Sequence, residues 1–547
     1  MGRWTKAGCF TLSALAVLLW GAFPGAAQTA FPEDSIVRQR CSACHKLDEK
    51  GKVEVIEETR KSPEEWKAVI LRMVRLNDAP LEDGLYHPAM KELSRHLGLA
   101  PEEMAQVAYY NSDENSQYRE VPQDDLEKRI FAACVRCHTY GKIASHRMTP
   151  AQWTENRNMH LGHYPTTVPQ MREMDWPKES EALVEHLSKK FPFEDPRWRQ
   201  WMEARREQDL TGTWKVAGYQ PGMGYYYGTY TFAADSAKGE DEYLVKKRVR
   251  YLDGTRFEWQ GRGTLYGEYH LRYALAPTPM TGRVEGVFDL DQAKGGFQGK
   301  WWTVVQDTNA YGNEAFFKTD GEPKVFAAFP RALQAAPGVE QSLTLVGVGL
   351  PESVAPEDIA FSGPGVKVRS VEAAGDSTLS CMVEVGDEAP VGTVQVSVKE
   401  QTCEDPLTIF DKLDGIRVYP ALGRARVSCG AAYPPHGVQF VARGVHFGPD
   451  GKADTQDDLV LEPVDAKWWL EEEKTREGDD DLKYLKAPVA NGLYTPVTTY
   501  GPIPSRKQKR EGVGLIAVGA SVTVEGKELK GRSLLAVTEP DFITHIK

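Results

Sequence analysis

The sequence predicts a multidomain protein in which an all-α region comes first and all-β domains follow. Apolar positions with helical spacing and helix-capping motifs lie before about residue 205, whereas later segments are short alternating runs that end at Gly or Asp. The chain has 547 residues, which is too long for one hydrophobic core. We therefore expect a leader at 1–27, a helical domain at 28–205, and β domains at 206–323, 324–408 and 409–547.

The helical region carries one cysteine motif twice, as Cys41-Ser-Ala-Cys44-His45 and Cys134-Val-Arg-Cys137-His138. With this spacing, both thiols add to the vinyl groups of a haem, and the histidine that follows ligates the iron. The alternative is one zinc site with four cysteine ligands, which would need neither histidine. We expect two covalent haem c groups, and therefore an all-α tandem dihaem cytochrome c domain.

A longer repeat surrounds these motifs. Ser62-Pro-Glu-Glu-Trp66 follows the first motif and Thr149-Pro-Ala-Gln-Trp153 follows the second. In each copy a hydroxyl residue can cap a helix that begins with proline. Leu93-Ser-Arg-His96-Leu97 and Leu183-Val-Glu-His186-Leu187 then continue the match. Each haem motif is thus followed by a capped helix with a tryptophan and by a second helix.

The repeat also predicts the second ligand of each iron. The residue seven positions after the repeated tryptophan is Met73 in the first half and His160 in the second. We predict His45 and Met73 as ligands of the first haem, and His138 and His160 as ligands of the second. Because a thioether ligand raises the reduction potential relative to imidazole, the two potentials should differ. Other candidate ligands remain, namely Met159, His163, His87, Met90, His96 and His186.

The amino terminus predicts export. Arg3 and Lys6 precede an uncharged apolar stretch, 9–23, and small residues follow at 24–27. A retained anchor is the alternative, but the stretch is shorter than the ~20 residues that a membrane span needs. No later segment is apolar enough to cross a bilayer. Covalent haem attachment after export places the protein in the periplasm, and its formal net charge of −12 argues against a nucleic-acid partner.

The rest of the chain predicts three β domains. Residues 211–322 contain tyrosine-rich alternating runs, such as Tyr225-Tyr-Tyr-Gly-Thr-Tyr-Thr-Phe232, which are typical of an antiparallel barrel. These tyrosines either fill the barrel or line a binding cavity. Alternating strands such as 342–350 and 533–538 indicate two immunoglobulin-like sandwiches.

Two features of the β domains leave alternatives open. The acidic turn from Asp450 to Asp458 clusters oxygen donors, either as a calcium site or as a solvated turn. It departs from the EF-hand pattern and lacks a final bidentate glutamate. Cys381, Cys403 and Cys429 remain after haem attachment, and Cys381 with Cys403 would link two strands of one sandwich.

The sequence contains no nucleophile–base set, phosphate loop or dinucleotide fingerprint, so we assign no catalytic residue. Two irons that each have two protein ligands favour electron transfer over chemistry at the iron. A dihaem peroxidase and a stand-alone electron carrier with β-sandwich binding domains are the alternatives. A peroxidase would need a haem with a displaceable ligand.

The sequence resembles the alpha subunit of quinohaemoprotein amine dehydrogenase over essentially the whole mature chain. The resemblance is carried by the paired haem motifs, by the spacing that leads to Met73 and His160, and by the continuation His160-Leu-Gly-His-Tyr-Pro-Thr166. It is also carried by a late segment from Gly448-Pro-Asp-Gly-Lys-Ala-Asp to Ala490-Asn-Gly-Leu-Tyr494.

The resemblance implies a periplasmic heterotrimer. A gamma subunit would carry cysteine tryptophylquinone, and a beta subunit would form a propeller. Primary amines would be oxidised to aldehyde and ammonia at that quinone, outside this chain. Electrons would then pass through the two haems to a soluble acceptor, such as a blue copper protein or a cytochrome c.

Overall fold

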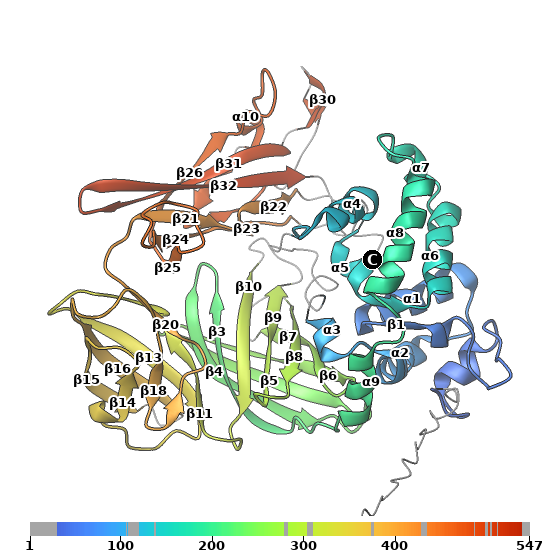
Figure 1. The fold of residues 1–547 in the computed structure, drawn as a ribbon, viewed down its shortest axis with the longest axis horizontal. Coiled ribbons are helices and arrows are strands. Elements are labelled where there is room, and N and C mark those ends of the chain that lie inside the picture. Colours follow the sequence, from blue (N-terminus) through green and yellow to red (C-terminus); the bar gives the residue numbers. More distant parts are fainter. Residues whose placement is uncertain are drawn as a thin grey trace, which may run out of the picture.

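The computed structural model describes residues 30–105, 107, 120–135, 138–277, 283–303, 310–373, 377–427, 435–485, 487–497, 502–503, 506–510 and 512–538. Figure 1 shows helices on the right, a green barrel, yellow and orange strands beside it, and a red group of strands above. The expected leader at 1–27 lies outside the described residues, as do Cys137 and Cys429. Among the described residues, every helix is too short or too polar to span a bilayer.

The first region is built from short helices. They are η1 (Val37–Cys41), η2 (Ile56–Glu58), α1 (Pro63–Asn77), α2 (Asp83–Leu97), α3 (Pro101–Met104), α4 (Asp125–Cys134), α5 (Tyr140–Ala144), α6 (Pro150–His163), α7 (Thr167–Gln170), α8 (Trp176–Lys190) and α9 (Pro196–Ala204).

The expected fold class is wrong for this region, because it is not all-α. Strand β1 (Thr59–Lys61) pairs antiparallel with β2 (His146–Met148), and Arg60 lies opposite Arg147. Each strand lies directly before a helix cap whose backbone is extended, and the two extended segments satisfy each other's peptide groups. The two halves are therefore joined by a small sheet.

The repeat is visible in matching hydrogen bonds. The Ser62 hydroxyl accepts from the Glu65 amide at the start of α1, and the Thr149 hydroxyl accepts from the Gln152 amide at the start of α6. The indole N–H of Trp66 donates to a carbonyl at 3.2 Å, and that of Trp153 does the same at 3.2 Å. The acceptors, Leu97 and Phe191, end the helix that packs on each tryptophan.

A buried ionic cluster stabilises the junction of the two halves. Glu103 accepts from Arg60 at 2.7 and 3.0 Å and from Arg147 at 2.9 Å. Arg60 also lies 4.4 Å from the ring centre of Trp198. Arg60 and Glu103 are fully enclosed, so each charge depends on the other.

The second region is a closed eight-stranded antiparallel barrel. Its strands are β3 (Gly212–Gln220), β4 (Gly224–Ala234), β5 (Glu242–Tyr251), β6 (Arg256–Tyr266), β7 (His270–Pro277), β8 (Val284–Asp291), β9 (Gly296–Thr303) and β10 (Tyr311–Lys318). They follow one another in chain order, and β10 pairs with β3 to close the barrel. Closure leaves no unpaired sheet edge.

The tyrosine-rich strands fill the barrel with a polar network. Glu314 accepts from Lys247 at 2.7 Å and from the hydroxyls of Tyr226, at 2.6 Å, and Tyr230. The ammonium group of Lys247 lies between 5.0 and 5.4 Å from the ring centres of Tyr226, Tyr230, Trp259 and Trp301. The tyrosines therefore serve the barrel's own packing, one of the two roles expected for them.

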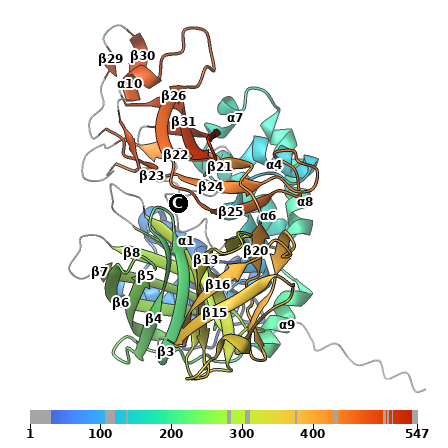
Figure 2. The ribbon, with the colours of Figure 1, turned by 90° about the vertical axis from the view of Figure 1, so that its left-hand side faces the viewer.

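The remaining strands form two further domains, which Figure 2 shows stacked beside and above the barrel. The first has β11 (Lys324–Phe329), β12 (Ala332–Gln334), β13 (Glu340–Val348), η3 (Pro356–Asp358), β14 (Ile359–Phe361), β15 (Val366–Ala373), β16 (Thr378–Val385), β17 (Gly392–Val394), β18 (Val396–Val398), β19 (Gln401–Thr402) and β20 (Leu407–Phe410).

The last domain has β21 (Gly415–Tyr419), β22 (Leu422–Arg426), β23 (Val438–Gln439), β24 (Val441–His446), β25 (Leu459–Pro463), β26 (Lys467–Glu472), α10 (Leu482–Leu485), β27 (Val489–Ala490), β28 (Leu493–Tyr494), β29 (Pro502–Ile503), β30 (Arg506–Arg510), β31 (Gly514–Val524) and β32 (Lys527–Thr538). Each domain combines antiparallel pairs with one parallel pair, β12 with β20 in the first and β22 with β32 in the last, and the immunoglobulin-like class of both stays a prediction.

An arginine of the same domain binds two carboxylates of the acidic turn. Arg417 donates to Asp454 at 2.8 Å and to Asp458 at 2.7 Å. Among the described residues, no group of three or more acidic, histidine or cysteine side chains is placed to hold a metal ion. Cys381 and Cys403 are both buried in the core of the preceding domain and form no disulfide.

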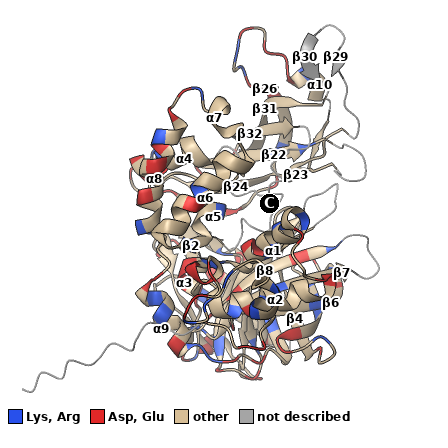
Figure 3. Ribbon diagram, turned by 90° about the vertical axis from the view of Figure 1, so that its right-hand side faces the viewer, with Lys and Arg blue, Asp and Glu red and all other residues tan. Residues whose placement is uncertain are grey.

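The helical region docks on the barrel through charged side chains. Figure 3 shows α1 and α2 beside β8 and β6. His270 is buried, and its ring nitrogens lie 2.9 Å from a Glu64 oxygen and 2.6 Å from an Asp289 oxygen. His87 makes a second contact, at 2.6 Å from Glu242. Because Glu64 begins α1, this interface fixes the helix that carries Met73.

Candidate haem site

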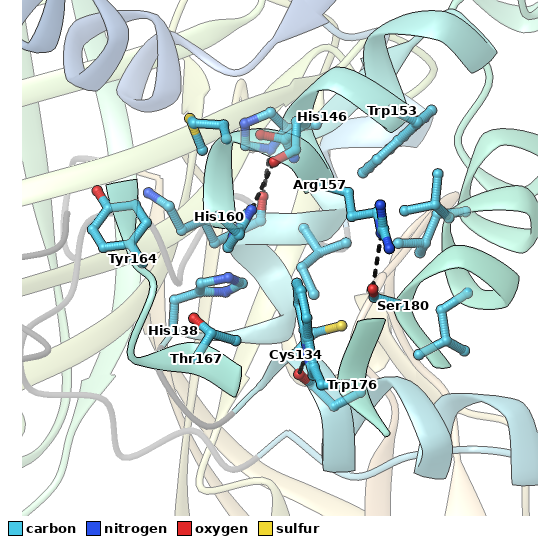
Figure 4. Close-up of a pocket in the computed structure, with 18 of the residues that line it drawn as sticks. Cys134, His138, His146, Trp153, Arg157, His160, Tyr164, Thr167, Trp176 and Ser180 are labelled. Atoms are coloured by element: carbon cyan, nitrogen blue, oxygen red, sulfur yellow. Dashed lines mark hydrogen bonds between the residues drawn. The ribbon is translucent and has the colours of Figure 1, made fainter. Parts of the chain in front are cut away.

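The second haem motif opens into a pocket between the two halves of the helical region. Figure 4 shows Cys134, His138 and His160 on its walls, with Trp153 and Trp176. Cys134 ends α4, His160 lies in the last turn of α6, and His138 lies between α4 and α5. Helix α1 of the first half supplies another wall, with Val69 and Arg72.

The two predicted histidines face each other across this pocket. Their ring centres lie 6.3 Å apart. With metal–nitrogen bonds of about 2 Å on opposite sides of one iron, two imidazole ring centres lie about 6 Å apart. The separation of His138 and His160 therefore suits two ligands of a single iron.

Hydrogen bonds fix which nitrogen of each ring is free. Nδ1 of His160 lies 2.7 Å from the Asn156 carbonyl, and Nδ1 of His138 lies 3.1 Å from the Thr139 carbonyl. A carbonyl oxygen only accepts, so both Nδ1 atoms carry the proton and both Nε2 atoms keep a lone pair. Backbone contacts of this kind orient metal-binding histidines in many proteins.

Burial keeps these histidines neutral. It lowers the pKa of His138 to about 4, and it also lowers the pKa of His160. A nearby third histidine, His146, has its pKa held well below the usual value by burial. An imidazole must be deprotonated to ligate iron, so His138 and His160 need not lose a proton near neutral pH.

The remaining walls suit a flat, largely apolar macrocycle. They include Ile143, Trp153, Met171, Trp176, Leu183 and Leu187, all of them buried. The indole N–H of Trp176 donates to the Ala133 carbonyl at 2.8 Å, which ties α8 to the turn before Cys134. The donor set and the walls therefore fit a covalently bound haem.

The pocket is rich in basic side chains. Lys61, Arg72, Lys142 and Arg157 line it, against a single carboxylate, Glu65, among the described residues. Lys142 binds Glu65 at 3.1 Å. Sequence reasoning missed these residues, because two of the four cations come from the first half of the repeat and reach the second half's motif only through the fold.

The first haem motif is more exposed. Cys41 ends η1 and is half-buried, whereas Cys44 is exposed. The His45 amide donates to the Cys41 carbonyl at 2.9 Å, so the motif forms one compact turn. Burial and the nearby Glu92 carboxylate raise the pKa of the Cys41 thiol to about 11.

The predicted ligand Met73 lies on α1 and is half-buried. Its sulfur lies 3.9 Å from the Asn77 amide nitrogen. Met90 packs on the apolar cluster that also contacts Cys41, whereas Met73 is not among the side chains of the described chain that do so. Met73 therefore stays a prediction that depends on the repeat, and Met90 is its rival by position.

The other candidate ligands have different contacts. His87 binds the barrel through Glu242, His96 packs edge-on against Phe31, and Met159 accepts from Arg72 at 3.7 Å. His163 packs beside Tyr164 at the end of α6.

Comparison with known proteins agrees with this site. Residues 32–198 match the family model "Quinohemoprotein amine dehydrogenase A, alpha subunit, haem binding". Residues 207–315 match alpha subunit domain II of the same enzyme, and residues 416–545 match alpha subunit domain IV. These matches define a haem-binding subunit of an oxidoreductase. The chain belongs to the family of quinohemoprotein amine dehydrogenase alpha subunits, and such a subunit is one part of a complex.

Other comparisons add little. No curated protein matches the chain. Among solved structures, a β-barrel titled EF1p2_mFAP2b bound to DFHBI is 14% identical, with a TM-score of 0.18, over 20% of this chain and 93% of its own. Rv2717c from M. tuberculosis is 12% identical, with a TM-score of 0.14, over 32% of this chain and 92% of its own. Scores this low say nothing about function.

Proposed function

We propose that the chain is the electron-transfer subunit of a periplasmic amine dehydrogenase and holds two covalent haem c groups. Cys41 and Cys44 would attach the first, and Cys134 and Cys137 the second. His45 with Met73, and His138 with His160, would be the iron ligands. The observation that carries the proposal is the pair of neutral imidazoles, His138 and His160, whose rings face each other at 6.3 Å beside Cys134.

The haem count is tested on the purified chain. A denaturing gel stained for haem should show a signal on this chain, because covalent haem survives denaturation. The double variant Cys134→Ala/Cys137→Ala should lose half of that signal, and Cys41→Ala/Cys44→Ala should lose the other half. An unchanged signal in either variant would refute covalent attachment at that motif.

The ligand pairs are tested by spectroscopy. Met73→His should lower one reduction potential and remove the methionine-to-iron charge-transfer band of the oxidised protein. Met90→Leu is the control, because Met90 is the rival sulfur near Cys41. Loss of the band in Met90→Leu, with retention in Met73→Leu, would show that Met90 is the ligand.

The partners would complete the enzyme. Oxidation of a primary amine to aldehyde and ammonia releases two electrons, whereas each haem iron exchanges one electron at a time. Two haems match that count. We propose that a gamma subunit with cysteine tryptophylquinone oxidises the amine, that a beta propeller completes the heterotrimer, and that a blue copper protein or a cytochrome c accepts the electrons.

This division of labour makes a simple prediction for the isolated chain. It should be reduced by a chemical reductant and should stay oxidised when mixed with a primary amine. With the partner subunits restored, the same amine should reduce it. Reduction of the isolated chain by amine, in a preparation free of quinone, would refute the proposal.

The periplasmic location has a separate test. Arg3 and Lys6, the apolar stretch at 9–23 and the small residues at 24–27 support an exported protein with a cleaved leader. Amino-terminal sequencing of the protein from a periplasmic fraction should begin near residue 28. A mature chain that still begins at Met1 would contradict cleavage.

A further inference from the structure

Four basic side chains line the second haem pocket and differ in their protein partners. Lys142 donates to Glu65 at 3.1 and 3.3 Å. Arg157 donates to the Ser180 hydroxyl at 3.0 Å and to the Pro177 carbonyl at 2.7 Å, and Figure 4 shows the Ser180 contact. These two cations are satisfied by the chain itself.

Among the described residues, the side chains of Lys61 and Arg72 have no such oxygen partner. Lys61 is 6% exposed, and its ammonium group lies 5.9 Å from the ring centre of Trp66. Within the described part of the chain, the Lys61 side chain makes no hydrogen bond or ion pair, and the Arg72 guanidinium donates to the weakly accepting sulfur of Met159, at 3.7 Å.

Burial of an unpaired ammonium is costly, and like charges nearby increase the cost. Burial, opposed by the Glu65 carboxylate and assisted by the positive charges of Arg72 and Lys142, lowers the pKa of Lys61 to about 7. The pocket as a whole has four basic side chains and one carboxylate among its described lining residues. Such a site favours an anionic group.

We infer that Lys61 and Arg72, which belong to the first half of the repeat, bind the propionate carboxylates of the haem held by the second half. This inference rests on the proposed haem at Cys134 and Cys137. A haem carries two carboxylates on one edge of an otherwise apolar ring, and a pocket with two neighbouring cations, Lys61 and Arg72, and apolar walls matches that distribution. Lys61 and Arg72 are thus positioning residues for the second haem.

A contact of Lys61 and Arg72 with the haem carboxylates would let the first half of the repeat change the reduction potential of the haem in the second half. A cation beside a haem carboxylate offsets its negative charge and raises the reduction potential, because the reduced iron has one positive charge fewer. It also keeps the carboxylate ionised, because a nearby cation lowers a carboxyl pKa. Without Lys61, the carboxylate should titrate at higher pH and the potential should become dependent on pH.

The test uses the full chain with its haems attached and begins with the haem count of each variant. Lys61→Met removes the cation, Lys61→Arg keeps it, and Arg72→Gln removes the other cation. Lys178→Met is the matched control, because Lys178 is exposed on α8, an element that also lines the pocket. Spectroelectrochemical titration then gives the potential of each haem across about pH 5–8.

We expect Lys61→Met to lower the potential of the second haem by the equivalent of about a tenfold change in its reduction equilibrium, ~59 mV for one electron. It should also make that potential vary with pH. Arg72→Gln should act in the same direction and less strongly. Lys61→Arg and Lys178→Met should leave both haems close to their native potentials.

The other possible results either support or overturn the inference. Loss of the second haem from Lys61→Met, with retention in Lys61→Arg, would support it, and loss from both would overturn it. Three results would overturn this inference and leave the proposed function standing. They are unchanged potentials in Lys61→Met and Arg72→Gln, equal shifts of both haems, and a shift in Lys178→Met as large as that in Lys61→Met. A native chain without haem at Cys134 would overturn the proposed function together with this inference.

Discussion

Lys247 lies inside the barrel and Lys61 lies at the haem pocket, and both side chains are buried. Lys247 donates to Glu314 at 2.7 Å and is surrounded by aromatic rings. Among the described residues, the ammonium group of Lys61 instead lies near one aromatic ring, that of Trp66, 5.9 Å from its centre. The barrel thus neutralises its buried charge with its own residues. The haem pocket presents cations that the described chain does not neutralise, which is what a binding site for an anionic group requires.

The histidines show the same difference. His270 lies between two carboxylates where the helical region meets the barrel; burial would lower its pKa, but Glu64 and Asp289 outweigh burial and raise it to about 9. In the haem pocket, burial lowers the pKa of His138 to about 4. The interface therefore uses a charged histidine as a structural contact, and the pocket keeps a neutral histidine available as a ligand.

The largest expected effect tests whether the barrel's charge pair is structural. Lys247→Met leaves the Glu314 carboxylate buried without a cation, and removal of one partner of a buried pair costs about 3–5 kcal/mol. Chemical denaturation monitored by tryptophan fluorescence should show this loss, because Trp259 and Trp301 lie next to Lys247.

A matched variant separates the charge from the packing. Lys247→Met/Glu314→Gln removes both charges and should recover most of the lost stability, since a buried ion pair and a neutral pair of similar volume often differ little. A loss below about 1 kcal/mol in the single variant would show that water reaches the barrel interior and would weaken the contrast with Lys61.

The next effect concerns pH and the interface between the helical region and the barrel. The pKa of His270 is raised from 6.5 to about 9, so the protonated form is favoured in the folded state. Its contribution to stability is fully present below pH 6.5 and is lost as the pH rises through about 9. The shift corresponds to about 3 kcal/mol, from 1.36 kcal/mol per pKa unit.

His270→Gln provides the comparison for this pH effect. The variant should be less stable than the native chain at about pH 6, and the difference should shrink toward pH 10 as the native histidine loses its proton. Denaturation midpoints measured at several pH values check this. A difference that stays constant across the range would mean that His270 is not protonated at the interface.

Much of the fold could be predicted from short patterns. The capped helices that begin at Pro63 and Pro150, and the antiparallel barrel, follow from local chemistry: cap residues, helical periodicity, and alternating strands between turns. The β1–β2 pairing could not be predicted in this way, because three-residue strands carry little alternation. A signal did exist, since Arg60 and Arg147 each lie two residues before a helix cap.

The candidate site also contains residues that local patterns predict and residues that they do not. His138 follows its motif and His160 follows from the repeat, so sequence alone could pair them, and the structure places their rings 6.3 Å apart. Lys61 and Arg72 lie more than sixty residues before that motif, and their role depends on how α1 packs against the second half. Contacts between repeats are not encoded in either repeat's own pattern.

The smallest expected effect tests whether the two halves are equivalent in stability as well as in sequence. Ser62→Ala and Thr149→Ala each remove a hydroxyl that accepts the amide of the third helical residue, in α1 and in α6 respectively. Loss of such a cap typically costs about 1 kcal/mol, within a range of about 0.5–2 kcal/mol. Because both helices begin with proline after the cap, the two losses should be similar, and denaturation curves of the two variants check this.

Ser62 is fully buried whereas Thr149 is half-exposed, so water can replace the lost acceptor only near Thr149. Any inequality should therefore make Ser62→Ala the more destabilising change. A clearly larger loss in Thr149→Ala would show that the half with the enclosed pocket depends more on its own helix start than the half with the exposed motif.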